Sequence, residues 1–195
     1  MNRIFIKSVL GGLMIAIGYV VYIEVTHILG AFMFSIGLIS IFQLGLCLYT
    51  GVISYTDKVA EIPFVVTVLV GNIVGCCLMF LFPYSESVEI VKEKLNDSHL
   101  QILLSSMLCN VLIFVAVEAN KHKNNILVIM SVATFILAGF NHSIANVCMV
   151  ISSRLFNFDT LALIVISIIG NTIGGIVTRK LVRYANSKDR VQLCG

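Results

Sequence analysis

The residues best suited to chemistry lie together in one apolar stretch of the chain. Gly139 to Asn146 has the sequence Gly-Phe-Asn-His-Ser-Ile-Ala-Asn, and the surrounding range from Ile126 to Ile151 contains no Asp, Glu, Lys or Arg. An imidazole and amide groups are costly at the depth of a membrane, so they usually line a pathway or a buried contact. The glycine and the clustered Asn and Ser side chains also weaken a helix. The segment therefore predicts a broken membrane helix that holds His142 at a translocation site.

The composition predicts an all-α integral membrane protein. Of the 195 residues, 58% are hydrophobic and 12% are charged, about half the charged share of a soluble protein. The mean hydropathy is +1.01. Apolar segments use nearly every residue, so we expect one transmembrane domain over residues 1–195. The formal charge of +3 gives no sign of a nucleic-acid partner.

Six apolar segments predict six transmembrane helices, and the second and fifth are long enough to be broken or tilted. With six spans, ten of the thirteen Lys and Arg residues lie on the side of the two termini, which places both termini in the cytoplasm and the protein in the cell membrane. The predicted spans are about Ile4–Val25, Leu29–Tyr55, Pro63–Phe82, Leu100–Ala119, Ile126–Ser152 and Thr160–Val182.

An internal repeat links the two halves of the chain. The third and sixth spans both contain the pattern apolar-Gly-Asn-x-x-Gly, at residues 70–75 and 169–174. A three-span half has an odd number of crossings, so the second copy must be inverted relative to the first, as in many transporters. The glycines have the spacing that lets helices approach closely, and the asparagines are expected to hydrogen-bond across helices. The second span should then break as the fifth does, at Leu48–Gly51, where Gly51 permits unusual backbone angles.

Other chemistries are poorly supported by the sequence. His142 and Ser143 are neighbours and make a poor catalytic pair, and no Gly-x-Ser-x-Gly or His-Glu-x-x-His pattern occurs, so an enzyme is not expected. The cysteines have no metal or redox spacing, and no cofactor or metal is predicted. A neutral-solute channel of the aquaporin kind is the alternative function, although the paired Asn-Pro-Ala loops of such channels are absent.

Several motifs together resemble the formate/nitrite transporter family. The fifth-span signature of that family, Gly-Phe-Glu-His-Ser-x-Ala-Asn, appears here at residues 139–146, and its second-span Leu-Phe-Thr-Ser appears as Leu-Tyr-Thr-Gly at residues 48–51. The fourth-span Cys-Asn-x-Leu motif lies at residues 109–112, and the closing Gly-Asn-x-x-Gly-Gly at residues 170–175. The resemblance covers all six spans in order.

The resemblance implies an aquaporin-like fold of two inverted three-helix repeats, assembled as a homopentamer in the lipid bilayer with one pore per subunit. It implies passage of small monovalent anions or their conjugate weak acids, such as formate, nitrite or hydrosulfide. By motif, His142 is the central pore histidine, Thr50 is its partner, and Asn110 lies near them. By its spacing before Asn110, Lys94 would draw anions into the outer vestibule; a solvated loop charge is the alternative. The apolar constrictions would be formed by Leu48, Tyr49, Ile113 and Phe135.

The chain also departs from the family pattern. Asn141 replaces the glutamate beside the histidine, Gly51 replaces a serine, and the segment before the first span is short. A bare anion cannot cross an apolar constriction, so we expect proton-linked passage of the neutral acid, in which His142 either donates the proton or only stabilises the permeant. A purely structural histidine, bonded to a neighbouring hydroxyl, is the alternative.

Overall fold

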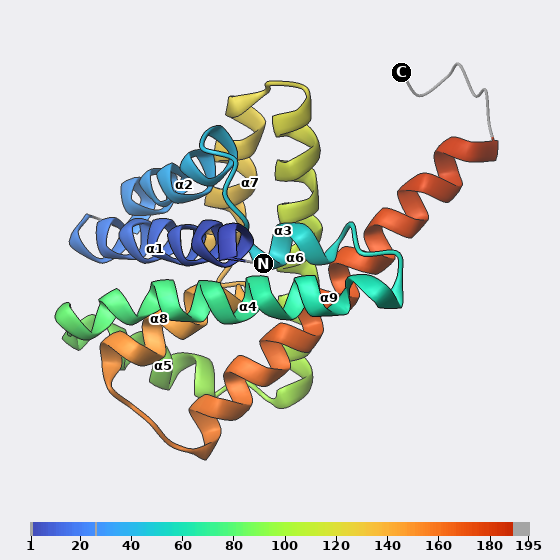
Figure 1. Cartoon of the computed structure of the whole chain (residues 1–195). Coiled ribbons are helices and arrows are strands. Elements are labelled where there is room, and N and C mark those ends of the chain that lie inside the picture. Colours follow the sequence, from blue (N-terminus) through green and yellow to red (C-terminus); the bar gives the residue numbers. More distant parts are fainter. Residues whose placement is uncertain (1, 26, 189–195) are drawn as a thin grey trace.

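The computed structural model describes residues 2–25 and 27–188, and the regular secondary structure in this range consists of helices (Figure 1). Arg190, one of the ten Lys and Arg residues on the side of the termini, and Cys194 lie outside the described residues. Helices α1 and α4 lie side by side and α2 packs on α1, whereas α6 packs on both α7 and α9. The elements are α1 Asn2–Glu24, α2 His27–Gln43, α3 Tyr49–Ile53, η1 Val59–Glu61, α4 Ile62–Cys76, η2 Cys77–Leu81, α5 Ser85–Leu95, α6 His99–Lys121, α7 Asn125–Leu137, α8 Ser143–Ser153 and α9 Phe158–Lys188.

Several of these helices have the length and polarity of membrane spans. Within the described residues, four helical stretches are long and apolar enough to cross a bilayer: Asn2–Glu24, Val59–Leu81, His99–Lys121 and Phe158–Ser187. Large apolar side chains on their outer faces, such as Val66, Leu104 and Leu181, are exposed in the single chain. Such faces suit contact with lipid or with a partner chain. The remaining apolar helices, α2, α7 and α8, are shorter.

Two helix breaks separate α2 from α3 and α7 from α8. Each break begins with a glycine at positive φ, Gly45 at 59° and Gly139 at 69°. In each case the next N–H reaches back to the carbonyl five residues earlier, from Leu46 to Ile41 and from Phe140 to Phe135, both at 2.9 Å. This is the Schellman ending of a helix, and it favours glycine because a Cβ is strained at positive φ.

The break in the second predicted span lies earlier than expected. Gly51 was expected to supply the unusual backbone angles, but it lies inside α3, and the glycine at positive φ is Gly45. The expectation was wrong because Gly45 and Gly51 give the same signal in the sequence, and the sequence alone does not show which of them forms the turn. The turn forms where the next N–H can complete the Schellman bond.

Asn72 and Asn171 hold the two breaks in the same way. Asn72 Nδ2 donates to the Ser8 and Cys47 carbonyls at 2.7 and 2.9 Å, and its Oδ1 accepts from the Tyr49 N–H at 2.8 Å. One amide therefore ties α4 to α1 and to both sides of the α2–α3 break. The expectation that these asparagines hydrogen-bond across helices is confirmed for Asn72.

Asn171 repeats this pattern in the second half. Its Nδ2 donates to the Ser106 and Asn141 carbonyls at 2.7 and 3.0 Å, and its Oδ1 accepts from the Ser143 N–H at 2.8 Å. The expectation is confirmed for this asparagine as well. The glycines beside it allow the close approach that these bonds need: a Cβ at Gly174 would overlap the Met107 backbone of α6.

Helix α5 is a short polar helix between the two halves, packed on α8 (Figure 1). A chain of buried hydroxyl groups fixes it: Tyr19 bonds Ser87 at 2.7 Å, Ser87 donates to Ser152 at 3.0 Å, and Ser152 donates to the Phe82 carbonyl at 2.8 Å. These bonds anchor the first turn of α5, and Lys94 lies at the other end of the same helix.

Candidate functional site

The two helix breaks bring His142 and Thr50 together. His142 is the N-cap of α8 and Thr50 lies in the first turn of α3, and both side chains are buried. Thr50 Oγ1 lies 2.9 Å from His142 Nε2. Leu48 is the counterpart of His142 in the first break. Leu48 lies between the carbonyl and the N–H that bind Asn72, and His142 lies between the carbonyl and the N–H that bind Asn171. The polar centre is thus asymmetric, with an imidazole at one N-cap and an apolar leucine at the other.

The hydrogen bonds of His142 fix its tautomer. Nδ1 accepts the backbone N–H of Ala145 at 3.2 Å, so this nitrogen carries no proton. The ring proton is therefore on Nε2, which donates to the Thr50 hydroxyl oxygen. The ring also stacks on Phe135, with centroids 5.7 Å apart and planes inclined by 16°. A proton added at Nδ1 would break the capping bond of α8.

One cavity approaches this centre from the side of α5. It has a volume of about 460 Å³, and we call it the Lys94 cavity. Its walls include Phe135 and His142 near the break and Glu93, Lys94 and Asp97 from α5 and the residues after it. Both polar and charged groups therefore line this cavity.

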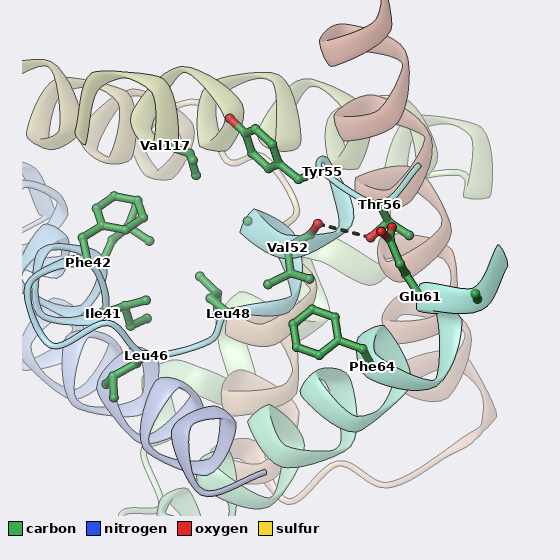
Figure 2. Close-up of a pocket in the computed structure, with 13 residues that line it drawn as sticks. Ile41, Phe42, Leu46, Leu48, Val52, Tyr55, Thr56, Glu61, Phe64 and Val117 are labelled. Atoms are coloured by element: carbon green, nitrogen blue, oxygen red, sulfur yellow. Dashed lines mark hydrogen bonds between the residues drawn. The ribbon is translucent and has the colours of Figure 1, made fainter. Parts of the chain in front are cut away.

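A second cavity approaches from the side of α3. It has a volume of about 540 Å³, and we call it the Leu48 cavity. Figure 2 shows that its walls are mostly apolar, with Phe42, Leu48 and Phe64 around the space and Glu61 beside Thr56. Lys121 and Arg179 both lie over the ring of Tyr55, another wall residue, at 4.0 and 4.7 Å from its centroid.

Two residues of α2 that the sequence did not reveal line the cavities. Phe34 lines the Lys94 cavity and Leu38, one turn later on α2, lines the Leu48 cavity. Phe34 meets Phe135 edge to face, with centroids 6.4 Å apart and planes at 84°. Both residues lie in a uniformly apolar span, so no sequence signal distinguishes them from core or lipid-facing residues.

The four predicted constriction residues fall into two groups. Leu48 and Phe135 are buried and line the Leu48 and Lys94 cavities, respectively. Tyr49 and Ile113 are also buried, but neither lines the Leu48 cavity or the Lys94 cavity. The Tyr49 hydroxyl instead hydrogen-bonds Thr172 of α9 at 2.6 Å.

Lys94 makes direct contact with the α7–α8 break. Its Nζ donates to the Gly139 carbonyl at 3.1 Å and to Asn141 Oδ1 at 3.0 Å, so it is more than a solvated loop charge. None of the ion pairs among residues 2–25 and 27–188 involves Lys94. Burial lowers the pKa of Lys94, and nearby groups that include Asp97 and Glu93 oppose this effect.

Asn141 lies behind this contact, whereas the side chain of Asn110 contacts Ser54. Asn141 Oδ1 accepts from Asn146 Nδ2 at 3.0 Å as well as from Lys94, and its Nδ2 donates to Ser105 Oγ at 2.8 Å. Asn110 lines neither cavity; its Nδ2 donates to Ser54 Oγ at 3.2 Å. Within the described range, no group of three or more His, Cys, Asp or Glu side chains is placed to hold a metal ion.

Comparison with known proteins identifies the family. The family model described as "Formate/nitrite transporter" matches residues 1–185. The chain belongs to the formate/nitrite transporter family. It is therefore a membrane transport protein of that family and not an enzyme.

Relatives of this family member agree with the assignment. It is 27% identical to "Uncharacterized transporter YrhG" of Bacillus subtilis (strain 168), over 96% of this chain and 86% of that protein. The solved structure "Pentameric formate channel with formate bound" matches with a TM-score of 0.82 and 21% identity, over 95% and 96% of the two chains. "FNT family ion channel" matches with a TM-score of 0.80 and 17% identity, over 94% and 88%. The helical fold of this chain is therefore the fold of these channels.

Proposed function

We propose that this family member is a membrane channel for small monovalent anions or their conjugate weak acids, of formate or nitrite size. The observation that carries the proposal is the His142–Thr50 pair, which lies where two broken helices meet and whose histidine lines the Lys94 cavity. Family membership and the structural similarity to a formate channel support the same permeant class.

The permeant crosses the barrier as the neutral acid. An isolated charge is very costly among apolar side chains such as Phe34, Leu38 and Phe135, whereas a protonated weak acid is not charged. Lys94 supplies a positive charge near the floor of its cavity, where an anion waits for a proton from water. The pH dependence of flux then follows the fraction of permeant that is protonated.

His142 stays neutral in this mechanism and acts through Nε2. Its Nδ1 is committed to the Ala145 N–H, so the Nε2–H is the group that a permeant oxygen can bind in exchange for Thr50. Of the two roles expected for this residue, stabilisation of the permeant fits these bonds better than donation of its own proton.

The architecture completes the proposal. We infer two inverted three-helix repeats of six spans, and the matched bonds of Asn72 and Asn171 support this inference. The exposed apolar outer faces and the pentameric structural neighbour support a homopentamer in the cell membrane. The excess of Lys and Arg on one side supports cytoplasmic termini, with the Lys94 cavity facing outward.

Uptake into proteoliposomes tests this function. We expect purified wild-type protein to admit formate and nitrite faster as the pH falls, and His142→Ala to reduce the flux roughly tenfold at every pH, the effect of one lost hydrogen bond at its upper range. His122→Ala, which alters an exposed histidine at the end of α6, is the matched control and should keep wild-type flux. Wild-type flux in His142→Ala would remove this residue from the mechanism. Rapid glycerol flux without pH dependence would favour the neutral-solute channel instead.

A further inference from the structure

Arg179 of α9 contacts the chain directly after α3 at three points. Its Nη1 pairs with Asp57 Oδ2 at 3.1 Å and donates to the Ser54 carbonyl at 3.4 Å, and its guanidinium lies 4.7 Å from the centroid of the Tyr55 ring. The Arg179 side chain is 19% exposed, whereas that of Arg183, which pairs with the same Asp57 oxygen at 3.2 Å, is 65% exposed. Exposed ion pairs contribute little, but a shielded arginine with several partners holds them in a defined geometry. Arg179 therefore fastens the end of α3 to α9.

A second set of contacts holds Tyr55 from the side of α6. The Tyr55 hydroxyl donates to Glu118, and its ring stacks on Phe114 with centroids 6.0 Å apart and planes inclined by 23°. Lys121 pairs with Glu118 at 2.7 Å and lies 4.0 Å from the centroid of the same ring. The segment that follows α3 is thus held between α6 and α9.

Helix α3 needs this support because it is short. It has five residues, Tyr49–Ile53, and a helix of this length is not stable by itself. At its start the Tyr49 N–H binds Asn72 Oδ1 at 2.8 Å, and at its end the carbonyl of Ser54, the C-cap, faces Arg179. A cation is favourable at the C-terminal end of a helix, where the carbonyls have no partner within the helix. Two side chains from neighbouring helices therefore fix the two ends of α3.

Thr50 lies between these two fixed ends. Its Oγ1 is 2.9 Å from His142 Nε2, and its backbone carbonyl accepts a hydrogen bond from Ser54 Oγ at 3.4 Å. Thr50 and Ser54 are one helical turn apart, so a displacement of Ser54 moves Thr50 relative to His142. The geometry of the His142–Thr50 pair therefore depends on what holds Ser54.

We propose that Arg179 is a positioning residue for the permeation site. Through Ser54 and Asp57 it holds α3 in the place where the Thr50 hydroxyl meets His142. Arg179 lines neither the Leu48 cavity nor the Lys94 cavity, so it acts through Thr50 and not on the permeant. This inference rests on the proposed function and adds to it a residue of α9 that the motifs around His142 and Thr50 do not include.

Formate uptake by proteoliposomes of the full chain, with Arg179→Met, Thr50→Val and the double variant compared at one acidic pH, tests this role. Arg179→Met keeps a long side chain and removes the charge and the N–H donors. Each single variant should reduce the flux roughly 3- to 10-fold. The double variant should have the flux of Thr50→Val, because Arg179 acts through the hydroxyl that Thr50→Val removes.

Two further variants complete the comparison. Arg183→Met makes the same substitution one turn later at an exposed residue that shares Asp57, so it is the matched control and should keep wild-type flux. Asp57→Asn keeps the shape of the side chain and removes the charge that pairs with Arg179. It should reduce the flux about two- to threefold, with no further effect in the Thr50→Val background, and it replaces Arg179→Met if that variant does not fold.

The outcomes separate this inference from the proposed function. A wild-type protein that passes neither formate nor nitrite contradicts the proposed function itself. Wild-type flux in Arg179→Met overturns the positioning role alone, and so does a double variant in which the two reductions multiply, because a residue that only stabilises the fold acts independently of Thr50. Reduced flux in Arg179→Met beside wild-type flux in Thr50→Val also overturns it. An equal loss in Arg183→Met does the same, because the effect would then come from the charge at the end of α9.

Discussion

Replacing Asn171 by leucine should destabilise the protein, because this side chain makes three buried hydrogen bonds across the α7–α8 break. The variant leaves the Ser143 N–H and the Asn141 carbonyl without these partners, whereas the Ser106 carbonyl lies within helix α6. Leucine has a similar size and offers neither donor nor acceptor, so the effect reports the lost bonds.

The expected magnitude follows from these contacts. Side-chain hydrogen bonds inside membrane proteins contribute about 0.6 kcal/mol on average, which gives roughly 2 kcal/mol for three. Two buried backbone groups left unpaired cost about 1–3 kcal/mol each, which gives roughly 2–6 kcal/mol. The two approaches overlap at the low end, so we expect about 2–4 kcal/mol. Asn72→Leu should match it, since Asn72 makes the corresponding bonds.

Denaturant titration of detergent-purified protein measures the free energy of unfolding. The chain has no Trp and six Tyr, so far-ultraviolet circular dichroism or tyrosine fluorescence reports unfolding. Asn125→Leu, at an exposed position that begins α7, is the control and should change stability by less than about 0.5 kcal/mol. Our reasoning is refuted if Asn171→Leu is as stable as this control, or if only one of the two buried variants is destabilised.

Three further predictions concern the proposed pathway. Lys94→Gln keeps a donor for the Gly139 carbonyl but removes the positive charge. The half-saturating anion concentration in uptake assays should therefore rise by about an order of magnitude. An unchanged concentration would show that Lys94 does not attract the anion. Burial lowers the pKa of Lys94, and rising pH removes the charge of a lysine. The wild-type protein should therefore lose the attraction between Lys94 and the anion at a lower pH than it would with an ordinary lysine. Lys94→Arg should retain this attraction as the pH rises. Phe34→Ala opens the edge-to-face contact with Phe135 and should raise leakage of chloride measured by a halide-sensitive dye; leakage equal to wild type would exclude Phe34 from the barrier.

Much of the fold could be predicted because polar residues stand out in an apolar chain. The Gly-Asn-x-x-Gly repeat and the polar segment around His142 predicted where helices are tied together and where one breaks. The second break was misplaced because Gly45 and Gly51 look equivalent without knowledge of the turn geometry. The contact of Lys94 with Asn141 joins residues far apart in sequence, and only the packing of α5 on α8 reveals it.

The walls of the pathway were harder to predict for a physical reason. Phe34 and Leu38 are apolar residues in an apolar helix, and the sequence does not show which face points inward. Tyr49 is predicted at the constriction from its place in the motif, and the motif does not reveal the hydrogen bond between its hydroxyl and Thr172. The direction in which a side chain points depends on which neighbouring residues it contacts, and these neighbours lie on several different helices.

Formate uptake by proteoliposomes as a function of pH, with wild type and Thr50→Val compared side by side, tests the central claim most directly. Thr50→Val removes only the hydroxyl that meets His142 Nε2 at 2.9 Å and keeps the shape of the side chain. We predict wild-type flux that rises as pH falls, and a flux in Thr50→Val that is several-fold lower with the same dependence on pH. Wild-type protein without formate or nitrite flux, or a Thr50→Val variant whose flux no longer depends on pH, would contradict the account.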